Sequence, residues 1–290
     1  MTTRRNFLKS SGLLAAGLGI SPLLSSETLH SMKQSAPSDR VNIGVIGVGM
    51  GCADMAGMLA NSWVHCVAMC DVDKERLESQ AADFKKRFPE NAANIKLYSD
   101  FRKLLEDKDI DGVIIATPDH WHTYIFGEAL KAGKAIYVEK PVANSIAECN
   151  AMIDLQQKYK GVVTTGLWQT SQRYFKAANE ILKTGVLGDV YKVQIFLCQS
   201  TNPRPPVEDS SIPNSLDYNM WLGPAPQRPY NYGRVRGWRG FWDYGGGQQT
   251  DWGGTLDRLS LRRIKSIRHE RPFLSVIRIL NGIQRPHFIQ

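Results

Sequence analysis

The residue best suited to proton chemistry follows a short apolar run. Residues 135–141 read AIYVEKP, so the run delivers Lys140 to its end and Pro141 comes directly afterwards. Proline disfavours a helical conformation of the residue before it and keeps the chain extended there. A lysine in a partly desolvated site is pushed toward neutrality and can exchange a proton near neutral pH. We therefore expect Lys140 to serve a reaction site, the alternative being a solvated charge at a strand end.

Two histidines separated by one residue form a second candidate. They lie within residues 117–122, which read TPDHWH. One interpretation is a metal site at His120 and His122, but the pair lacks the carboxylate or cysteine cluster that completes such sites. The other is a cofactor-facing loop and helix start, with Asp119 capping the helix. We favour the second interpretation and expect no metal ion.

A glycine-rich turn predicts where a dinucleotide binds. Apolar residues 41–46 lead into three glycines, a helical pattern follows, and a second apolar run, 64–70, ends on Asp71. Glycines let the backbone approach a pyrophosphate, and the helix N-terminus offers unpaired N–H groups. Asp71 lies 24 residues after Gly47, where an acid can accept hydrogen bonds from the adenosine ribose. Cys52 takes the third glycine position of G-x-G-x-x-G, so we expect slightly looser helix–strand packing; an ordinary strand–helix–strand unit is the alternative.

Alternating strand and helix patterns predict the scaffold that brings these residues together. Such a pattern indicates a parallel sheet with right-handed crossovers, whose ligands bind beyond the carboxyl ends of the strands. The predicted elements are strands at 41–46, 64–70, 95–98 and 112–117, a strand leading to Lys140, helices at 73–88 and 100–105, and a helix that a Ser145–Glu148 capping box begins.

The positive charge of the chain is concentrated near its end. The net charge is +8, of which residues 255–290 contribute +6, with eight Lys and Arg against two acidic residues. This distribution gives no reason to infer a nucleic-acid surface, and we expect no nucleic-acid partner. The five cysteines lack metal-type spacing and are predicted to be core residues rather than a disulfide framework, with Cys66 and Cys70 on one face of a strand.

The first 40 residues are typical of an export signal. Arg4 and Arg5 precede an apolar, Gly- and Ala-rich run at 12–24, which is too short for a membrane span. Paired arginines in this context mark the twin-arginine route. We expect export to the periplasm, with the segment either cleaved or kept as an anchor. The alternative, an amphipathic helix, is disfavoured because the apolar residues do not keep one face.

Several short motifs form a combination that is jointly specific. They are Gly47-Val48-Gly49, Asp71, Ala116-Thr117-Pro118-Asp119-His120, Glu139-Lys140-Pro141, Thr165-Gly166, the GVLG of residues 185–188, Trp221-Leu222-Gly223-Pro224, Trp238-Arg239 and the WDYGGG of residues 242–247. Together they resemble the glucose–fructose oxidoreductase / inositol dehydrogenase / rhizopine-catabolism (Gfo/Idh/MocA) family, especially its exported twin-arginine members. The resemblance covers roughly residues 41–254.

This resemblance implies an α/β fold: a Rossmann doubly wound parallel sheet that binds NAD(P), then a second α/β domain with an open sheet. Asp71 would repel a 2′-phosphate, so NAD is expected rather than NADP. The expected domains are a signal and linker at 1–40, a Rossmann domain at 41–163, a partial second domain at 164–254 and an atypical basic tail at 255–290. The expected cofactor-binding residues are Gly47, Val48, Gly49, Met50, Asp71, Thr117, Pro118, His120, Glu139 and Lys140.

The family pattern also places an acid, and a histidine four residues later, beside the lysine. Asp251 matches and would orient or tune Lys140, so these two are the expected catalytic residues. Position 255 is Thr, which cannot exchange a proton at neutral pH. Residues 255–258, Thr-Leu-Asp-Arg, can be encoded as ACA CTT GAT CGA, and reading this sequence one base later begins with CAC, a codon for His. We therefore hypothesise that a frameshifted tail replaces the rest of the second domain. A short natural variant with a basic tail is the alternative.

The resemblance implies hydride transfer between NAD and a sugar, polyol or cyclitol, with homo-oligomers among full-length members. An NAD-dependent glycosidase and a nucleotide-binding remnant without catalysis are the alternatives. Aromatic residues in 202–236 suit stacking on a sugar or burial in the core equally. In the second domain we expect a strand at 162–168, a helix at 174–183 and a new sheet from 190–199, while the glycines at 245–247 suggest close approach to a cofactor or partner subunit.

Overall fold

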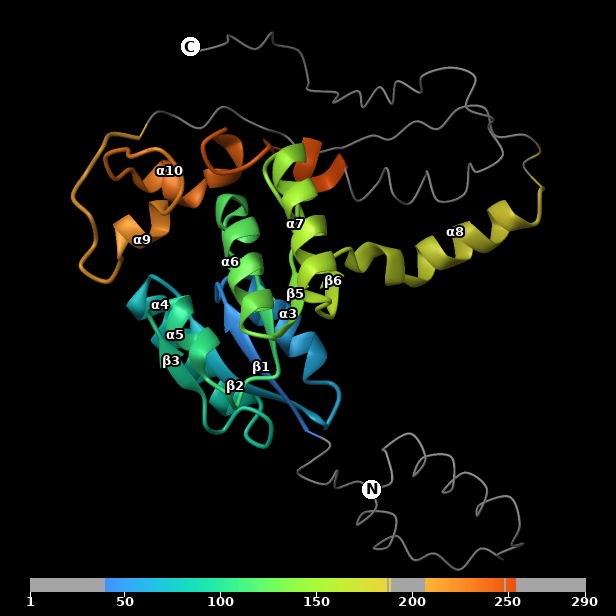
Figure 1. Cartoon of the computed structure of the whole chain (residues 1–290), viewed down its shortest axis with the longest axis horizontal. Coiled ribbons are helices and arrows are strands. Elements are labelled where there is room, and N and C mark those ends of the chain that lie inside the picture. Colours follow the sequence, from blue (N-terminus) through green and yellow to red (C-terminus); the bar gives the residue numbers. More distant parts are fainter. Residues whose placement is uncertain (1–39, 187, 189–206, 248, 254–290) are drawn as a thin grey trace, which may run out of the picture. The chain divides into compact units, whose positions relative to one another are not determined.

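The structure, a computed structural model, describes residues 40–186, 188, 207–247 and 249–253 (Figure 1). From Val41 onward these residues belong to one compact unit. The expected export signal, new sheet and basic tail lie outside the described residues and stay predictions. Among the residues that are described, no helix has the length and apolar character needed to cross a membrane.

Six parallel strands form one sheet in the order β3-β2-β1-β4-β5-β6. They are β1 (Val41–Ile46), β2 (Val64–Cys70), β3 (Lys96–Tyr98), β4 (Gly112–Ile115), β5 (Ala135–Val138) and β6 (Val163–Thr165). The chain adds strands on one side of β1 and then returns to add them on the other, which creates a switch point between β1 and β4. Dinucleotides bind at such a point, and the predicted Rossmann sheet is confirmed.

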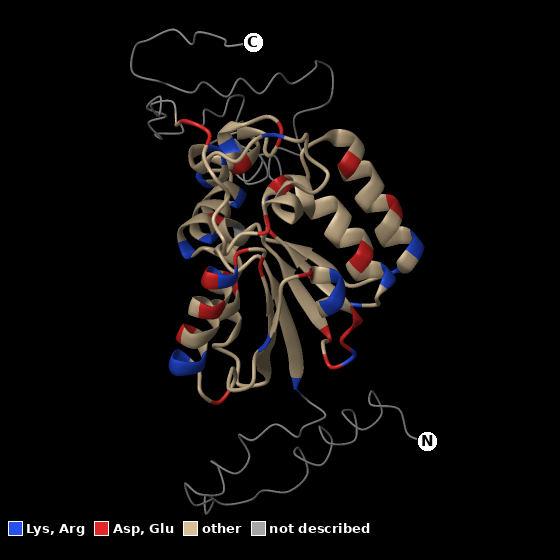
Figure 2. Cartoon of the chain, turned by 90° about the vertical axis from the view of Figure 1, so that its left-hand side faces the viewer, with Lys and Arg blue, Asp and Glu red and all other residues tan. Residues whose placement is uncertain are grey.

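Helices cover both faces of this sheet. Met55 and Phe84, from α3 and α4, belong to one buried cluster, whereas Leu104 and Phe126, from α5 and α6, belong to the other. The helices are α3 (Met50–Met58), α4 (Lys74–Arg87), α5 (Phe101–Glu106), α6 (Asp119–Lys131), α7 (Ile146–Tyr159), α8 (Arg173–Lys183), α9 (Tyr218–Leu222) and α10 (Tyr232–Arg236), with short 3-10 turns η2 (Trp168–Ser171) and η3 (Trp238–Gly240) and a π-helical turn η4 (Gln249–Gly253). Figure 2 shows basic and acidic residues interspersed along the helices in that view.

Side chains cap two of these helices, and the cap of α7 was predicted; a third helix begins differently from its prediction. Asp73 caps α4, and Ser145 and Glu148 form the predicted capping box of α7. The prediction that Asp119 caps α6 is wrong. Pro118 occupies the N-cap position without a side-chain hydrogen bond, and Asp119 is the first helical residue. Its carboxyl group is therefore free of a capping role.

A β-bulge in β2 overturns the prediction for two cysteines. Consecutive residues 43–44 of β1 pair with Cys66 and Ala68, so Val67 is an extra residue in β2. An extra residue reverses the alternation of side chains beyond it. Cys66 consequently packs in the cluster that contains α3, and Cys70 packs in the opposite one. All four cysteines in the described part are free thiols, three of them buried.

Strand β6 is shorter than predicted. It ends at Thr165, because Leu167 donates its backbone N–H to the Thr165 carbonyl oxygen at 2.7 Å and turns the chain. Trp168 then begins η2 instead of extending the strand. Helix α8 begins within one residue of its predicted start and has no buried residue.

A later part of the chain returns to the carboxyl edge of the sheet. Leu216 forms an isolated bridge with Asp73, and Lys74 donates its backbone N–H to the Ser215 carbonyl at 2.8 Å. The indole N–H of Trp121 donates to main-chain carbonyls of α9 at 3.0 and 3.1 Å. Residues 213–239 therefore lie over the edge where the predicted site residues meet.

The aromatic residues of this returning segment have two fates. Tyr218, Trp221 and Tyr230 are buried in a third cluster, together with Tyr244. Tyr232, by contrast, is 54 % exposed. Trp221, Tyr230 and Tyr232 all line the cavity described below, so two of the three core rings also form part of its wall.

Candidate dinucleotide and substrate site

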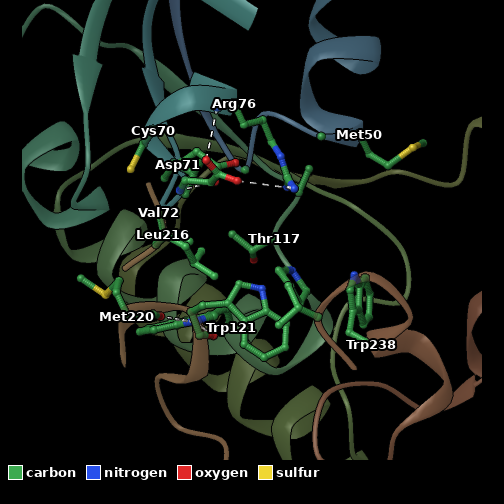
Figure 3. Close-up of a pocket in the computed structure, with 18 of the residues that line it drawn as sticks. Met50, Cys70, Asp71, Val72, Arg76, Thr117, Trp121, Leu216, Met220 and Trp238 are labelled. Atoms are coloured by element: carbon green, nitrogen blue, oxygen red, sulfur yellow. Dashed lines mark hydrogen bonds and ion pairs between the residues drawn. The ribbon is translucent and has the colours of Figure 1, made fainter. Parts of the chain in front are cut away.

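A cavity of ≈ 600 Å³ lies beyond the carboxyl ends of β1, β2, β4 and β5 (Figure 3). Asp71 and Arg76 lie on one side of it, Trp121 and Trp238 lie across from them, and Thr117 lies between. This volume is typical of pockets for small ligands and cofactors. The returning segment supplies the wall opposite the sheet.

The glycine turn lies close to the backbone that follows β4. Gly47 has φ +90°, and a Cβ there would lie 2.6 Å from the Ala116 carbonyl oxygen. A Cβ at Gly49 would meet nothing within 4 Å, which leaves the backbone open to the cavity. Gly51 makes the tight helix–strand contact, since its Cβ would lie 2.7 Å from Val45. Looser helix–strand packing was expected at Cys52, but the close contact of the motif is made one residue earlier, at Gly51.

Asp71 joins the end of β2 to the glycine turn. Its Oδ2 accepts a hydrogen bond from the Val48 N–H at 3.0 Å, and its Oδ1 accepts one from the Asp73 N–H at 3.0 Å. Burial raises the pKa of this carboxyl, while both hydrogen bonds oppose the rise. Asp71 lines the cavity, where an adenosine ribose could reach it.

Lys140 and Asp251 meet, although 111 residues separate them. The Lys140 Nζ donates to Asp251 Oδ1 at 2.8 Å and to its carbonyl oxygen at 3.0 Å. The Trp252 ring lies 5.0 Å from Nζ, and Arg239 Nε contacts Asp251 Oδ1 at 3.4 Å. The peptide bond between Lys140 and Pro141 is cis. The lysine amine is therefore held by a partner rather than isolated at the end of its strand.

Glu139 is fixed beside Lys140 by two donors. The Lys140 backbone N–H and the Tyr137 hydroxyl donate to its two carboxylate oxygens at 3.1 and 3.2 Å. Burial raises the pKa of this carboxyl. A side chain at Gly166 would overlap Glu139 Oε1, which explains why glycine follows β6 here.

The two histidines bind main-chain carbonyls. His122 lies between the Pro141 carbonyl, 2.8 Å from Nδ1, and the Thr117 carbonyl, 2.9 Å from Nε2. Burial lowers the pKa of His122 to about 4. The His120 Nε2 lies 3.0 Å from the Trp221 carbonyl, and burial lowers the pKa of His120. Within the described residues, no three His, Cys, Asp or Glu side chains gather as metal ligands would.

The cavity brings most of the predicted residues together. Val48 and His120 do not line it: Val48 is fully buried, and His120 packs against α9. Asp251 acts on the cavity through Lys140. The residues that do line it are Gly47, Gly49, Met50, Asp71, Thr117, Pro118, Glu139 and Lys140.

Sequence reasoning missed two residues at this site. Asp119 lines the cavity, and a Cβ on Gly245 would lie 3.1 Å from its Oδ2 and 3.0 Å from the Trp238 ring. The glycines at 245–247 were predicted to approach a cofactor or a partner subunit closely. At Gly245 the close neighbours are instead Asp119 and Trp238 of this same chain. Arg239 contacts Asp251, but the sequence indicated it only as part of the Trp238-Arg239 motif and did not predict which residue it contacts.

The lining of the cavity has a free polar group, open backbone and a carboxylate that suit a dinucleotide. The Thr117 hydroxyl is buried without a hydrogen-bond partner in the described part, and Thr117 lines the cavity. Gly49 leaves room for close approach of a phosphate to the backbone. Asp71 offers a carboxylate at the end of β2. The residues present fit an NAD molecule.

Two family models, which describe the two domains of one oxidoreductase family, match successive parts of the chain. Residues 41–167 match the family described as "Oxidoreductase family, NAD-binding Rossmann fold". Residues 176–259 match its companion, "Oxidoreductase family, C-terminal alpha/beta domain".

Individual relatives have matching parts of their sequence or fold. The inositol 2-dehydrogenase of Salmonella typhimurium is 33% identical over 148 residues, covering 50% of this chain and 42% of that protein. A glycosyl hydrolase family 109 protein of Shewanella pealeana is 33% identical over 168 residues, covering 53% and 37%. These matches span less than half of both curated relatives.

A solved NAD-binding protein from Listeria innocua has a TM-score of 0.59 at 20% identity, covering 78% of this chain and 54% of that one, which shows the shared fold. The sheet order, the glycine turn and the two family matches lead to one conclusion: the chain belongs to the Gfo/Idh/MocA family of NAD-binding oxidoreductases.

Proposed function

We propose that this chain transfers hydride between NAD and a sugar, polyol or cyclitol. The observation that carries the proposal is the Lys140–Asp251 pair, whose lysine lines the same cavity as the glycine turn and Asp71. The inositol 2-dehydrogenases among the relatives support the substrate class.

The residues of the site have distinct roles in the proposed reaction. The open backbone at Gly49 and the Asp71 carboxylate would hold the nucleotide, which supplies a hydride acceptor when bound. Lys140 Nζ would contact the reacting hydroxyl group and exchange its proton. Asp251 positions that amine through its carboxylate and carbonyl oxygens, at 2.8 and 3.0 Å, and leaves the third ammonium hydrogen for a ligand.

Turnover with a panel of cyclitols, polyols and hexoses tests the proposal. NADH formation is measured for the wild type, for Lys140→Met and for Lys131→Met, a matched change of an exposed lysine whose ion pair lies on α6. We expect Lys140→Met to lower turnover by at least about a hundredfold with NAD binding retained, because proton transfer is lost. Equal turnover in Lys140→Met and the wild type would refute the role of the lysine.

A second candidate is an NAD-dependent glycosidase. It is supported by the family 109 glycosyl hydrolases among the relatives. Product analysis separates the two activities. Release of a sugar from a glycoside without net NADH favours the glycosidase, whereas net NADH favours the dehydrogenase.

A third candidate is a nucleotide-binding remnant without catalysis. It is supported by Thr255, which stands where the family pattern has a histidine that can exchange a proton. NAD binding without turnover on any substrate, together with turnover after a family-like C-terminus is attached, would favour it. We keep the frameshifted tail as a proposal, although the family match extends to residue 259. Sequencing the coding region tests it, since codons that cannot yield His at this position rule it out.

We also propose export through the twin-arginine route. The support is the Arg4-Arg5 pair followed by the short apolar run at 12–24. Fractionation of cells expressing the chain, with Arg4→Lys/Arg5→Lys as the control, tests it. Periplasmic or membrane-attached protein that the double variant retains in the cytoplasm supports the route, and equal distribution of both proteins contradicts it.

A further inference from the structure

Asp119 is a buried acid of the cavity that no contact described so far explains. It is only 3 % exposed and lines the cavity, and the direction of its pKa shift is set by burial and surrounding charges, with no hydrogen bond among the causes. Asp71 and Glu139, which line the same cavity, each accept two hydrogen bonds. Burying a carboxylate costs free energy unless a partner compensates its charge, so this group is suited to meeting a ligand.

The order of the strands places Asp119 on the reacting half of the site. Asp71 follows β2, the glycine turn follows β1, Asp119 opens the helix after β4 and Lys140 follows β5. A dinucleotide spans the switch point between β1 and β4, with its adenosine on the Asp71 side. Its nicotinamide end would therefore lie on the side of Asp119 and Lys140.

The charges around Asp119 nearly cancel without it. Lys140 and Arg239 contribute two positive charges, and Asp251 and Glu148 contribute two negative ones. The carboxyl of Asp119 therefore sets the sign of the local charge. The charged and titratable groups that face it are Arg239, Asp251, Lys140 and Glu148, and the two buried imidazoles on its own helix are His120 and His122.

We propose that ionised Asp119 makes this site favour the oxidised nicotinamide, which carries a positive charge, over the reduced ring, which carries none. The inference rests on the NAD site of the proposed function and needs no assumption about the substrate. A carboxylate as buried as Asp119 interacts strongly with a cation held beside it, because the local dielectric constant lies below that of water. The reduced ring gains nothing from the same carboxylate.

The preference for the oxidised nucleotide must then depend on pH. Burial, and to a smaller degree Asp251, raise the pKa of Asp119 to about 8, against the opposing effect of Arg239 and Lys140. Asp119 is neutral below this pH and ionised above it, so the affinity for NAD⁺ rises as the pH rises through about 8. A nearby opposite charge lowers a carboxyl pKa by roughly 1–3 units, and each unit corresponds to about a tenfold change in affinity.

Binding of the two nucleotides to the full chain tests the proposal without a substrate. Dissociation constants for NAD⁺ by calorimetry and for NADH by its fluorescence are measured from about pH 6 to about pH 10. The variants are Asp119→Asn and Asp119→Ser, which both remove the charge. Glu90→Gln is the matched control, because Glu90 is an exposed acid that does not line the cavity.

In the wild type and in Glu90→Gln, we expect the ratio of NAD⁺ to NADH affinity to rise at least about tenfold across this range. In both Asp119 variants the ratio stays flat at its low-pH value while NADH affinity is unchanged. His120 and His122 do not confuse the result, because burial lowers the pKa of both rings.

Two outcomes would overturn the proposal, and they are distinguishable. A wild-type ratio that is independent of pH, or a pH-dependent ratio that persists in Asp119→Asn and Asp119→Ser, overturns the role of Asp119 and leaves the NAD site intact. Failure of the folded wild type to bind either nucleotide overturns the proposed function together with this inference. Circular dichroism of each variant establishes that it is folded.

Discussion

Two glycines of the same turn are expected to respond differently to the same substitution. Gly47→Ala places a Cβ 2.6 Å from the Ala116 carbonyl oxygen at a residue with φ +90°. Gly49→Ala places one in open space at φ −67°. The first change therefore acts on the fold, and the second acts on the ligand.

The magnitudes follow from these geometries. Left-handed backbone costs a non-glycine residue roughly 1–2 kcal/mol, and forcing a methyl group into a packed site costs about 1–3 kcal/mol more. We expect Gly47→Ala to lower the free energy of unfolding by about 3 kcal/mol, which is a loss of roughly 6–12 °C in Tm for a domain of this size. Gly49→Ala should cost clearly less than Gly47→Ala, because its Cβ meets nothing within 4 Å. It should nevertheless weaken NAD⁺ binding by at least about tenfold, because its methyl group occupies the path of the phosphates.

Thermal unfolding followed by circular dichroism gives the Tm of both variants, and calorimetry gives the NAD⁺ affinity of Gly49→Ala. A Tm for Gly49→Ala as low as that of Gly47→Ala would refute the assignment of separate roles. So would a Gly47→Ala variant that melts with the wild type, since the contact with the Ala116 carbonyl would then be absent in solution.

Two further predictions concern buried charges. The side chains of Lys140 and Asp251 are only 15 % and 9 % exposed. Asp251→Ala should therefore lower the free energy of unfolding by about 3 kcal/mol, because it leaves the buried charge of Lys140 unpaired, and adding Lys140→Met should recover part of that loss. Urea unfolding measures both effects, and strictly additive losses in the double variant would contradict the coupling. Burial, and then the charge of Glu139, raise the pKa of Asp54 to about 7. The folded state thus holds its proton more tightly, and stability falls as the pH rises from about 4 to about 7. Asp54→Asn should remove this part of the pH dependence, and an unchanged stability profile would exclude Asp54 as its source.

The elements that depend on local patterns could be predicted from the sequence. The ends of β1 and β2, the capping box at Ser145 and Glu148, and the delivery of Lys140 by a buried strand all follow from residues within a few positions of one another. Apolar periodicity and capping chemistry act over this same short range.

The features that sequence reasoning missed depend on distant contacts. The bulge at Val67 is visible only in the pairing of β2 with β1. His120 was expected to face the cofactor, yet its ring lies against a carbonyl 101 residues away. Asp119 was expected to cap its helix, but Pro118 already occupies that position and leaves the carboxyl to the cavity. The sequence pattern around a residue does not indicate which distant residues will contact it in the folded chain.

The bridge between Asp73 and Leu216 has a consequence for the order of events during synthesis. The glycine turn and Asp71 leave the ribosome early, whereas the opposite wall of the cavity comes from residues 213–239. A nascent chain therefore presents only an open half-site until about four-fifths of its residues have been translated. Nucleotide that occupies the complete cavity is captured after this point, by a chain whose folding has already brought its later residues back to its earliest strands.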